Sequence, residues 1–187
     1  MATSAFRLRL AARAIAQGGV IAYPTEAVFG LGCDPLNEQA VTRLLALKQR
    51  DPAKGLILIA AERDQLEPYV DFDSPQVSAR IGDTWPGPVT WILPARPQTP
   101  AWLTGAHDTL AVRVTAHPTA AALCRACGDA IVSTSANHSG QTPARTLSAV
   151  RLRFGDELDS VVPGHCGGQA GPTEIRDSRT GKVLRAG

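Results

Sequence analysis

Three cations lie within the seven-residue polar stretch 48–54, which reads Lys-Gln-Arg-Asp-Pro-Ala-Lys. Before it, apolar residues recur at helical spacing behind a potential N-cap at Asn37, and this pattern predicts a helix. Pro52 is expected to end that helix, and Gly55 to turn the chain into an apolar strand over 56–60. The cations are therefore expected in a helix-to-strand loop.

The types of these cations, Lys48, Arg50 and Lys54, suit a polyanion. A lysine ammonium is a mobile point charge, whereas an arginine guanidinium is a fixed fork for phosphate oxygens. Cations at a helix C-terminus are also favoured by the helix dipole alone and are commonly only solvated. The stretch by itself leaves ligand binding and a solvated surface both open.

Two further segments carry hydroxyl and amide groups directly after predicted strands. One spans 24–32, contains Thr25 and two glycines, and is expected to be a loop. The other follows a later apolar run and contains Ser133, Ser135 and Asn137. Ligands of α/β proteins collect where strands end. Because serine and asparagine are also ordinary turn residues, a binding loop and a plain turn both remain open.

The predicted strand 109–114 places a cation inside the sheet. Its side chains alternate, with Leu110 and Val112 on one face and Arg113 on the other. An unpaired buried charge is strongly destabilising. Arg113 is therefore either paired with a carboxylate or available to an anionic ligand.

The inventory of functional side chains suits binding and transfer at phosphate better than acid-base hydrolysis. The sequence has no G-x-x-x-x-G-K-S/T phosphate loop, no complete G-x-G-x-x-G and no H-E-x-x-H. No acidic cluster predicts a metal site, so magnesium is expected only with the phosphates of a nucleotide. Nucleotidyl transfer depends on charge stabilisation and alignment more than on a protein nucleophile. The candidate groups are Lys48, Arg50, Lys54, Arg113, Arg185, Thr25, Thr109, Ser133, Ser135, Asn137 and Thr173.

Strands that alternate with helices predict an α/β fold. A short helix is expected over 63–69, and a closing hairpin over 174–185. The proline-rich connection 94–108 is the least regular stretch and is expected to be a mobile flap. The prediction is a single domain over 1–187, with a twisted, open, mixed sheet flanked by helices.

Composition and charge limit the partners and the compartment. The net charge of +2 is too small to identify a nucleic-acid partner, although it permits an anionic ligand. No apolar run reaches the length of a membrane span. Four scattered cysteines without a secretory signal favour a cytoplasmic location. Cys124 and Cys127 end a predicted helix and have no second ligand pair, so they are expected to be core thiols rather than a redox or zinc motif.

The N-terminal residues 5–17 carry three arginines and no acid, as a mitochondrial transit peptide would. Leu8, Ala11 and Ile15 form a helical stripe, and a predicted strand over 20–23 follows at once. This order favours a helix that belongs to the domain, with a transit peptide as the alternative.

Several motifs occur together along the chain. They are Pro24-Thr25-Glu26 with Gly30-Leu31-Gly32, the K-x-R pair Lys48 and Arg50, Trp85-Pro86-Gly87-Pro88, Thr109-Leu110-Ala111-Val112-Arg113, and the S-x-N pair Ser135 and Asn137. As a set, and over the whole chain, they resemble the threonylcarbamoyl-AMP synthase family, the YrdC-like proteins, in its short bacterial form. The resemblance implies an open α/β sheet with a large basic concave face.

The resemblance also implies a reaction and its partners. Members of the family join L-threonine, bicarbonate and ATP to threonylcarbamoyl-adenylate and release pyrophosphate. Threonine's amine is expected to capture bicarbonate as a carbamate, whose oxygen attacks the α-phosphate, with magnesium carried by ATP. The product leads to threonylcarbamoyladenosine in tRNA, so the implied downstream partner is the tRNA threonylcarbamoyl-transferase machinery. Direct contact with tRNA stays open.

Roles follow from the resemblance for the matched residues. ATP is expected at Lys48, Arg50, Thr109, Ser135, Asn137 and Arg185. Threonine is expected at Thr25, Arg113, Ser133 and Thr173. Lys48, Arg50, Ser135 and Asn137 are the expected catalytic residues, and no residue is expected to ligate a metal.

The sequence departs from the family pattern at two positions. Asp51 adds a carboxylate after the K-x-R pair, and the segment from Thr173 to Asp177 replaces the S-T-I-x-D that many members have. The resemblance does not extend to the extra C-terminal domain of the longer family form, so the connection 94–108 is the expected closure of the site.

Other functions remain as alternatives. A basic concave face would also suit a non-catalytic RNA-binding module, although aromatic residues make up only 5% of the chain and base stacking needs them. A sugar-phosphate lyase of similar fold would need an acidic metal cluster, which the sequence does not offer. A carbamoyl-adenylate enzyme with another acceptor would have the same ATP site.

Overall fold

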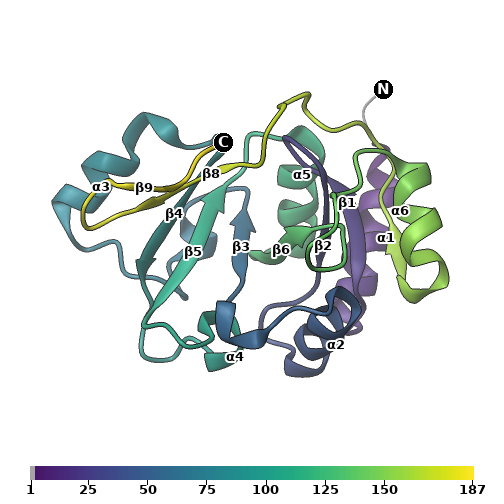
Figure 1. The fold of residues 1–187 in the computed structure, drawn as a ribbon, viewed down its shortest axis with the longest axis horizontal. Coiled ribbons are helices and arrows are strands. Elements are labelled where there is room, and N and C mark those ends of the chain that lie inside the picture. The colour runs from purple at the N-terminus through teal and green to yellow at the C-terminus, as the bar shows by residue number, and fades with distance from the viewer. Residues whose placement is uncertain (1–2) are drawn as a thin grey trace.

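The short apolar runs of the sequence form the strands of one mixed nine-stranded sheet (Figure 1). The computed structural model describes residues 3–187, so the first two residues of the predicted domain lie outside it. The strands are β1 (Ile21–Pro24), β2 (Phe29–Gly32), β3 (Ile57–Ala60), β4 (Val89–Pro94), β5 (Thr109–Val114), β6 (Ile131–Ser135), β7 (Ser160–Val161), β8 (Glu174–Asp177) and β9 (Val183–Arg185). Their order across the sheet is β7-β1-β2-β6-β3-β5-β4-β8-β9. The predicted α/β fold with a mixed, open sheet is confirmed.

Helices connect the strands and cover the sheet. The α-helices are α1 (Ala5–Ala16), α2 (Glu38–Lys48), α3 (Pro75–Ile81), α4 (Ala101–Thr104), α5 (Pro118–Cys127) and α6 (Leu147–Phe154). The 3-10 helices are η1 (Pro52–Lys54), η2 (Asp64–Leu66), η3 (Gly82–Thr84) and η4 (Gly155–Glu157). The side chains of Ser4, Asn37, His117 and Thr146 each accept a hydrogen bond from the backbone N–H three residues on, and so fix where α1, α2, α5 and α6 begin.

The core consists of two clusters because side chains alternate between the faces of the sheet. Val132 of β6 lies in the larger cluster with Leu44 of α2. Its neighbour Ile131 lies in the smaller cluster with Ile15 of α1 and Leu123 of α5. Helices α1 and α5 pack against each other on this second face, where α1 contacts β1 and β7 and α5 contacts β1 and β3 (Figure 1).

The predicted loop over 24–32 is wrong in its second half. Residues 29–32 form β2, which pairs with β1 in an antiparallel hairpin. A Cβ atom on Gly32 would lie 2.4 Å from the backbone oxygen of Val132, so the close approach of β2 and β6 requires glycine there. The two glycines are strand residues rather than turn residues.

Three boundaries also differ from the predictions. Helix α2 ends at Lys48, where Gln49 takes the left-handed conformation with φ 52°, and Pro52 instead begins η1. The helix expected over 63–69 is only the turn η2. The connection 94–108 contains α4 and is held on both sides of it, because Arg96 N–H donates to the Tyr69 carbonyl and Ala106 N–H to the Ala53 carbonyl. It is a packed connection rather than a free flap.

Among residues 3–187, the helices are all too short or too polar to cross a membrane.

Candidate active site

A cavity of about 560 Å³ opens on the sheet face that α1 and α5 cover elsewhere. Alternate residues of four neighbouring strands line it: Ser133 and Ser135 of β6, Ile57 of β3, Ala111 and Arg113 of β5, and Ile92 of β4. The strand register brings them together, because Ile57 lies opposite both Ser133 and Ala111, and Ile92 lies opposite Ala111. The sheet thus forms the floor of the site.

Arg113 lies at one end of this cavity and is almost fully buried. Its guanidinium donates to Thr90 at 3.1 Å, to Thr173 at 3.2 Å and to Glu26 Oε2 at 3.3 Å. Its Nε atom is buried without a partner. Of the two alternatives raised by the sequence, the structure shows the first, a pairing with a carboxylate, and Arg113 also lines the cavity.

Glu26 is the partner that sequence reasoning did not include among the site residues. Its other oxygen accepts a hydrogen bond from Thr115 Oγ1 at 2.5 Å. Burial acts to raise the pKa of Glu26, but the Arg113 charge and the Thr115 hydroxyl oppose it, and the pKa is lowered overall. The carboxylate is therefore ionised near neutral pH and neutralises Arg113. Two features of the sequence could have indicated Glu26 as a site residue. It follows Thr25 directly, and Arg113 needs a carboxylate partner.

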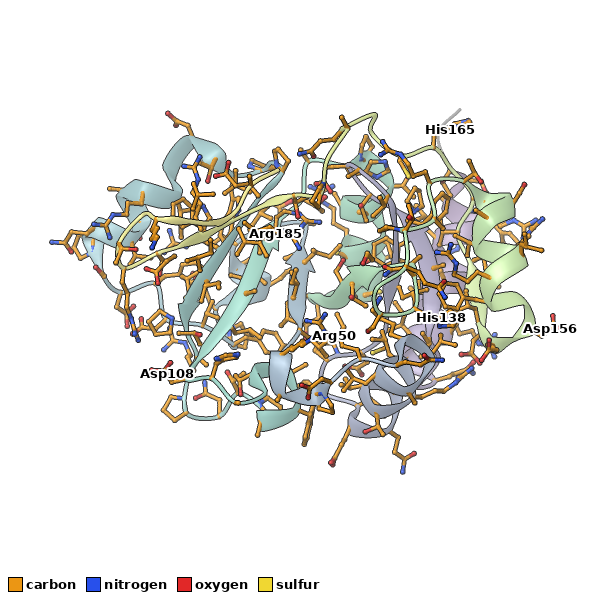
Figure 2. All side chains as sticks on the ribbon, viewed as in Figure 1. Arg50, Asp108, His138, Asp156, His165 and Arg185 are labelled. Carbon is orange, nitrogen blue, oxygen red and sulfur yellow. The ribbon has the colours of Figure 1, made fainter. Side chains whose placement is uncertain are left out.

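Four cations besides Arg113 line the cavity, and they are Arg50, Lys54, Arg145 and Arg185. Arg50 donates to the Gly55 carbonyl at 2.9 Å, and its Nε atom is buried without a partner. Burial lowers the pKa of Arg50 and of Arg185, and the charge of Arg113 contributes to the shift at Arg185. In Figure 2, Arg185 lies on the C-terminal hairpin and Arg50 lies below it, both near the centre of the view.

Asp51, the carboxylate that departs from the family pattern, caps η1 by accepting from Ala53 N–H at 2.9 Å. Its charge acts to raise the pKa of Arg50, against the larger effect of burial. Asp51 is exposed and does not line the cavity. It thus serves the turn that presents Lys54.

The segment 163–173, called the strap below, crosses over the site between β7 and β8. Backbone N–H groups of the strap donate to the carbonyls of Thr25 and Glu26, and Arg145 donates to two strap carbonyls at 2.7 and 3.0 Å. Arg185 holds its end through the Thr173 carbonyl at 2.6 Å. Of the described residues, 170–173 of the strap line the cavity, whereas none from 94–108 does. Sequence reasoning missed the strap and Arg145.

The structure brings seven of the ten predicted site residues to this cavity. They are Thr25, Arg50, Arg113, Ser133, Ser135, Thr173 and Arg185. The other three do not line it. Lys48 at the end of α2 and Asn137 in the loop that follows β6 are both buried, and Thr109 lies at the start of β5, opposite Pro94.

Other chemistry that the sequence raised finds no site in the structure. Residues 3–187 bring no three His, Cys, Asp or Glu side chains into an arrangement that could hold a metal ion. Cys124 and Cys127 are free thiols, and burial raises the pKa of Cys127 to about 12, which keeps it a poor nucleophile. Their predicted role as core thiols fits these observations.

The fold and the cavity define a class: an α/β protein whose sheet carries a cavity lined by cations, beside a paired, buried arginine. Residues 13–187 match the Sua5/YciO/YrdC family, described as Telomere recombination. The chain is 58% identical to the threonylcarbamoyl-AMP synthase of Nitrosococcus oceani, over 99% of this chain and 100% of that protein. It is 57% identical to the threonylcarbamoyl-AMP synthase of Halorhodospira halophila, over 98% and 96%.

A solved structure agrees with this similarity. P. abyssi Sua5 complexed with L-threonine is 30% identical, with a TM-score of 0.92 over 99% of this chain. The chain spans 55% of that longer protein. The protein therefore belongs to the Sua5/YciO/YrdC family, and the family resemblance derived from its motifs is confirmed.

Proposed function

We propose that this protein is a threonylcarbamoyl-AMP synthase, which joins L-threonine, bicarbonate and ATP to give threonylcarbamoyl-AMP and pyrophosphate. The observation that carries the proposal is the cavity with two unlike ends, a charge-neutral Arg113–Glu26 end and a cationic end. Full-length similarity to proteins of that name supports it.

Threonine is placed at the Arg113 end. The guanidinium of Arg113 suits the amino-acid carboxylate, and Thr25, Ser133 and Thr173 offer hydroxyl groups at the same cavity. Because Glu26 neutralises Arg113, a zwitterion enters without changing the net charge of this end. The threonine complex of P. abyssi Sua5, a relative of this chain, is consistent with a threonine site in this fold.

ATP is placed at the cationic end, with its phosphates near Arg50, Lys54 and Arg185 and the Ser135 hydroxyl. Threonine's amine and bicarbonate condense to a carbamate with loss of water. A carbamate oxygen then attacks the α-phosphorus, and the bond to the pyrophosphate oxygen breaks. The arginines stabilise the charge that develops on the phosphates. Magnesium carried by ATP would neutralise part of the pyrophosphate charge. No protein nucleophile is needed.

The proposal extends to the domain organisation, the cellular location and the downstream partners of the protein. The whole chain, 1–187, is proposed to act as one domain, since its strands join in one sheet. Four free cysteines support a cytoplasmic location. The labile product would pass to a tRNA threonylcarbamoyl-transferase machinery, and tRNA itself is a candidate partner.

The test is pyrophosphate release by the purified protein with ATP and magnesium, with threonine and bicarbonate each added or omitted. We expect release only when both are present, together with the mass of threonylcarbamoyl-AMP in the quenched mixture. Release that ignores threonine would assign another acceptor. No release, with salt-sensitive RNA binding by the folded protein, would favour the RNA-binding alternative.

A further inference from the structure

Lys48 is a buried lysine whose ammonium is already occupied. It is the last residue of α2 and only 2% exposed. Its Nζ atom donates to the Ser135 carbonyl at 2.5 Å and to the Asn137 carbonyl at 2.8 Å. It does not line the cavity. The charge is therefore directed at the loop that follows β6 rather than at the site.

The same loop returns two contacts to the end of α2. Ser139 N–H donates to the Lys48 carbonyl at 2.8 Å, and His138 Nδ1 lies 2.9 Å from the Leu47 carbonyl oxygen. These carbonyls belong to the last turn of α2, where no helical partner is available. The loop and the helix end thus form one hydrogen-bonded unit.

A second cation works alongside Lys48. Arg153 of α6 donates to the Ala136 carbonyl at 3.1 Å and to the Thr142 carbonyl at 2.7 Å. Cations outside the cavity therefore hold the carbonyls of three consecutive residues, 135–137. Carbonyl oxygens would repel phosphate, and these are occupied by cations that do not line the cavity, while Ser135 does line it.

Lys48 also fixes the start of the cationic stretch. Arg50 follows it by two residues, and its backbone N–H donates to the Leu45 carbonyl within the helix end. Movement of the Lys48 anchor would therefore displace both the Arg50 side chain and the Ser135 hydroxyl.

We propose that Lys48 is a positioning residue and not a nucleotide ligand: it ties the end of α2 to the loop after β6, and so sets Arg50 and Ser135 in register for the phosphates. This inference rests on the proposed function, because it takes the cationic end of the cavity as the ATP site.

The first test uses the wild-type protein and its three lysines, Lys48, Lys54 and Lys182. An amine-specific reagent is applied near pH 8, with and without magnesium ATP, and the sites are measured by mass spectrometry. Burial lowers the pKa of Lys48 to about 8, with the charges of Arg50 and Arg153 adding to the shift. His138 is the other titratable group at this contact. Lys48 would therefore react readily if the reagent reached it.

We expect Lys48 to stay unlabelled in both conditions, Lys54 to lose its labelling when ATP binds, and Lys182 on the distant hairpin to be unaffected. Labelling of Lys48 that ATP suppresses would overturn the positioning role, because it would place the ammonium on the nucleotide. Failure of ATP to protect Lys54 would count against the proposed ATP site, whereas Lys48 would still report on the anchor.

The second test is a pair of double-mutant cycles on ATP affinity. Lys48→Met and Ser135→Ala are expected to be strongly non-additive, since the first displaces the group that the second removes. The matched cycle of Lys54→Met with Ser135→Ala is expected to be additive within about twofold, because these residues share no hydrogen-bond partner. Additive effects of Lys48→Met would refute the proposal. If Lys48→Met does not unfold cooperatively, Lys48→Gln, which keeps an N–H donor, replaces it in the same cycle.

Discussion

The two ends of the cavity treat positive charge in opposite ways. At one end, Arg113 is buried and ion-paired with Glu26 at 3.3 Å. At the other, Arg50, Lys54 and Arg185 have no carboxylate within ion-pair distance among residues 3–187. The charge of Arg113 is thus compensated within the protein, whereas the charges of the other three cations are not.

With the two substrates placed as proposed, this difference would let one cavity distinguish a carboxylate from a polyphosphate. A compensated arginine offers geometry, namely a fixed donor for a carboxylate, with little long-range field. Uncompensated cations offer a field that attracts a polyphosphate and weakens as salt is added. The two ends should therefore respond differently to substitution, to pH and to ionic strength.

The largest effect is expected from Arg113→Ala. Removing one partner of a buried pair leaves the Glu26 charge uncompensated, which typically costs about 3–5 kcal/mol of folding free energy. Loss of a charge-assisted hydrogen bond should also weaken threonine use by about 10- to 150-fold. Denaturant unfolding and the dependence of pyrophosphate release on threonine measure the two effects.

Two matched variants make this prediction sharper. Arg125→Ala removes the exposed pair with Glu62, and its cost should be about 1 kcal/mol or less. Adding Glu26→Gln to Arg113→Ala should restore much of the stability but none of the threonine use. If the single variant kept its threonine dependence and lost ATP binding, the two ends would have been assigned the wrong way round.

Arg50→Ala addresses the cationic end and should have the next largest effect. We expect ATP binding to weaken by about 1.5–3 kcal/mol, because a charge-assisted contact to phosphate is lost. Stability should hardly change, since Arg50 has no carboxylate to leave unpaired. Titration calorimetry with ATP measures this, and Arg151→Ala, an exposed arginine outside the cavity, is the control. A large fall in stability would show that Arg50 is structural.

Much of this arrangement was predictable from local patterns. Helical spacing, N-caps and alternating strands gave the α/β fold and most of its elements. The strand pattern around Arg113 even posed the correct question, whether the arginine has a partner or awaits a ligand. Seven of the ten predicted site residues line one cavity, because strand ends and polar loops collect at the same face of the sheet.

The remainder depends on contacts between residues far apart in the sequence. Glu26 and Arg113 are 87 residues apart, and no periodicity indicates that they meet. Lys48 has the residue type of a phosphate ligand, but its direction depends on carbonyls of a loop that is likewise 87 to 89 residues away. The β2 strand was missed because its four residues include two glycines, which usually mark turns.

A smaller effect is expected in the pH dependence of stability, which tests whether Glu26 is ionised at the neutral end. The pKa of Glu26 is lowered in the folded protein, so its contribution is complete above the ordinary glutamate pKa of about 4.3 and is lost as pH falls through the folded value. Below about pH 4 the wild type should therefore lose stability faster than Glu26→Gln. If the unfolding free energies of the two proteins changed with pH in the same way from pH 6 to pH 3, an ionised, paired Glu26 would be contradicted.

The smallest effect is expected at Thr173, which joins the two ends. Its hydroxyl lies 3.2 Å from Arg113 and 3.5 Å from Arg185, while its carbonyl separately holds Arg185. Thr173→Val removes only the hydroxyl, so threonine use should weaken by about 1 kcal/mol, roughly fivefold, and ATP binding by less than twofold. The ATP affinity of this variant should still fall with added salt as steeply as in the wild type, since the cations remain. Equal losses for threonine and ATP would mean that the hydroxyl couples the ends, and that the neutral and cationic halves do not act as separate sites.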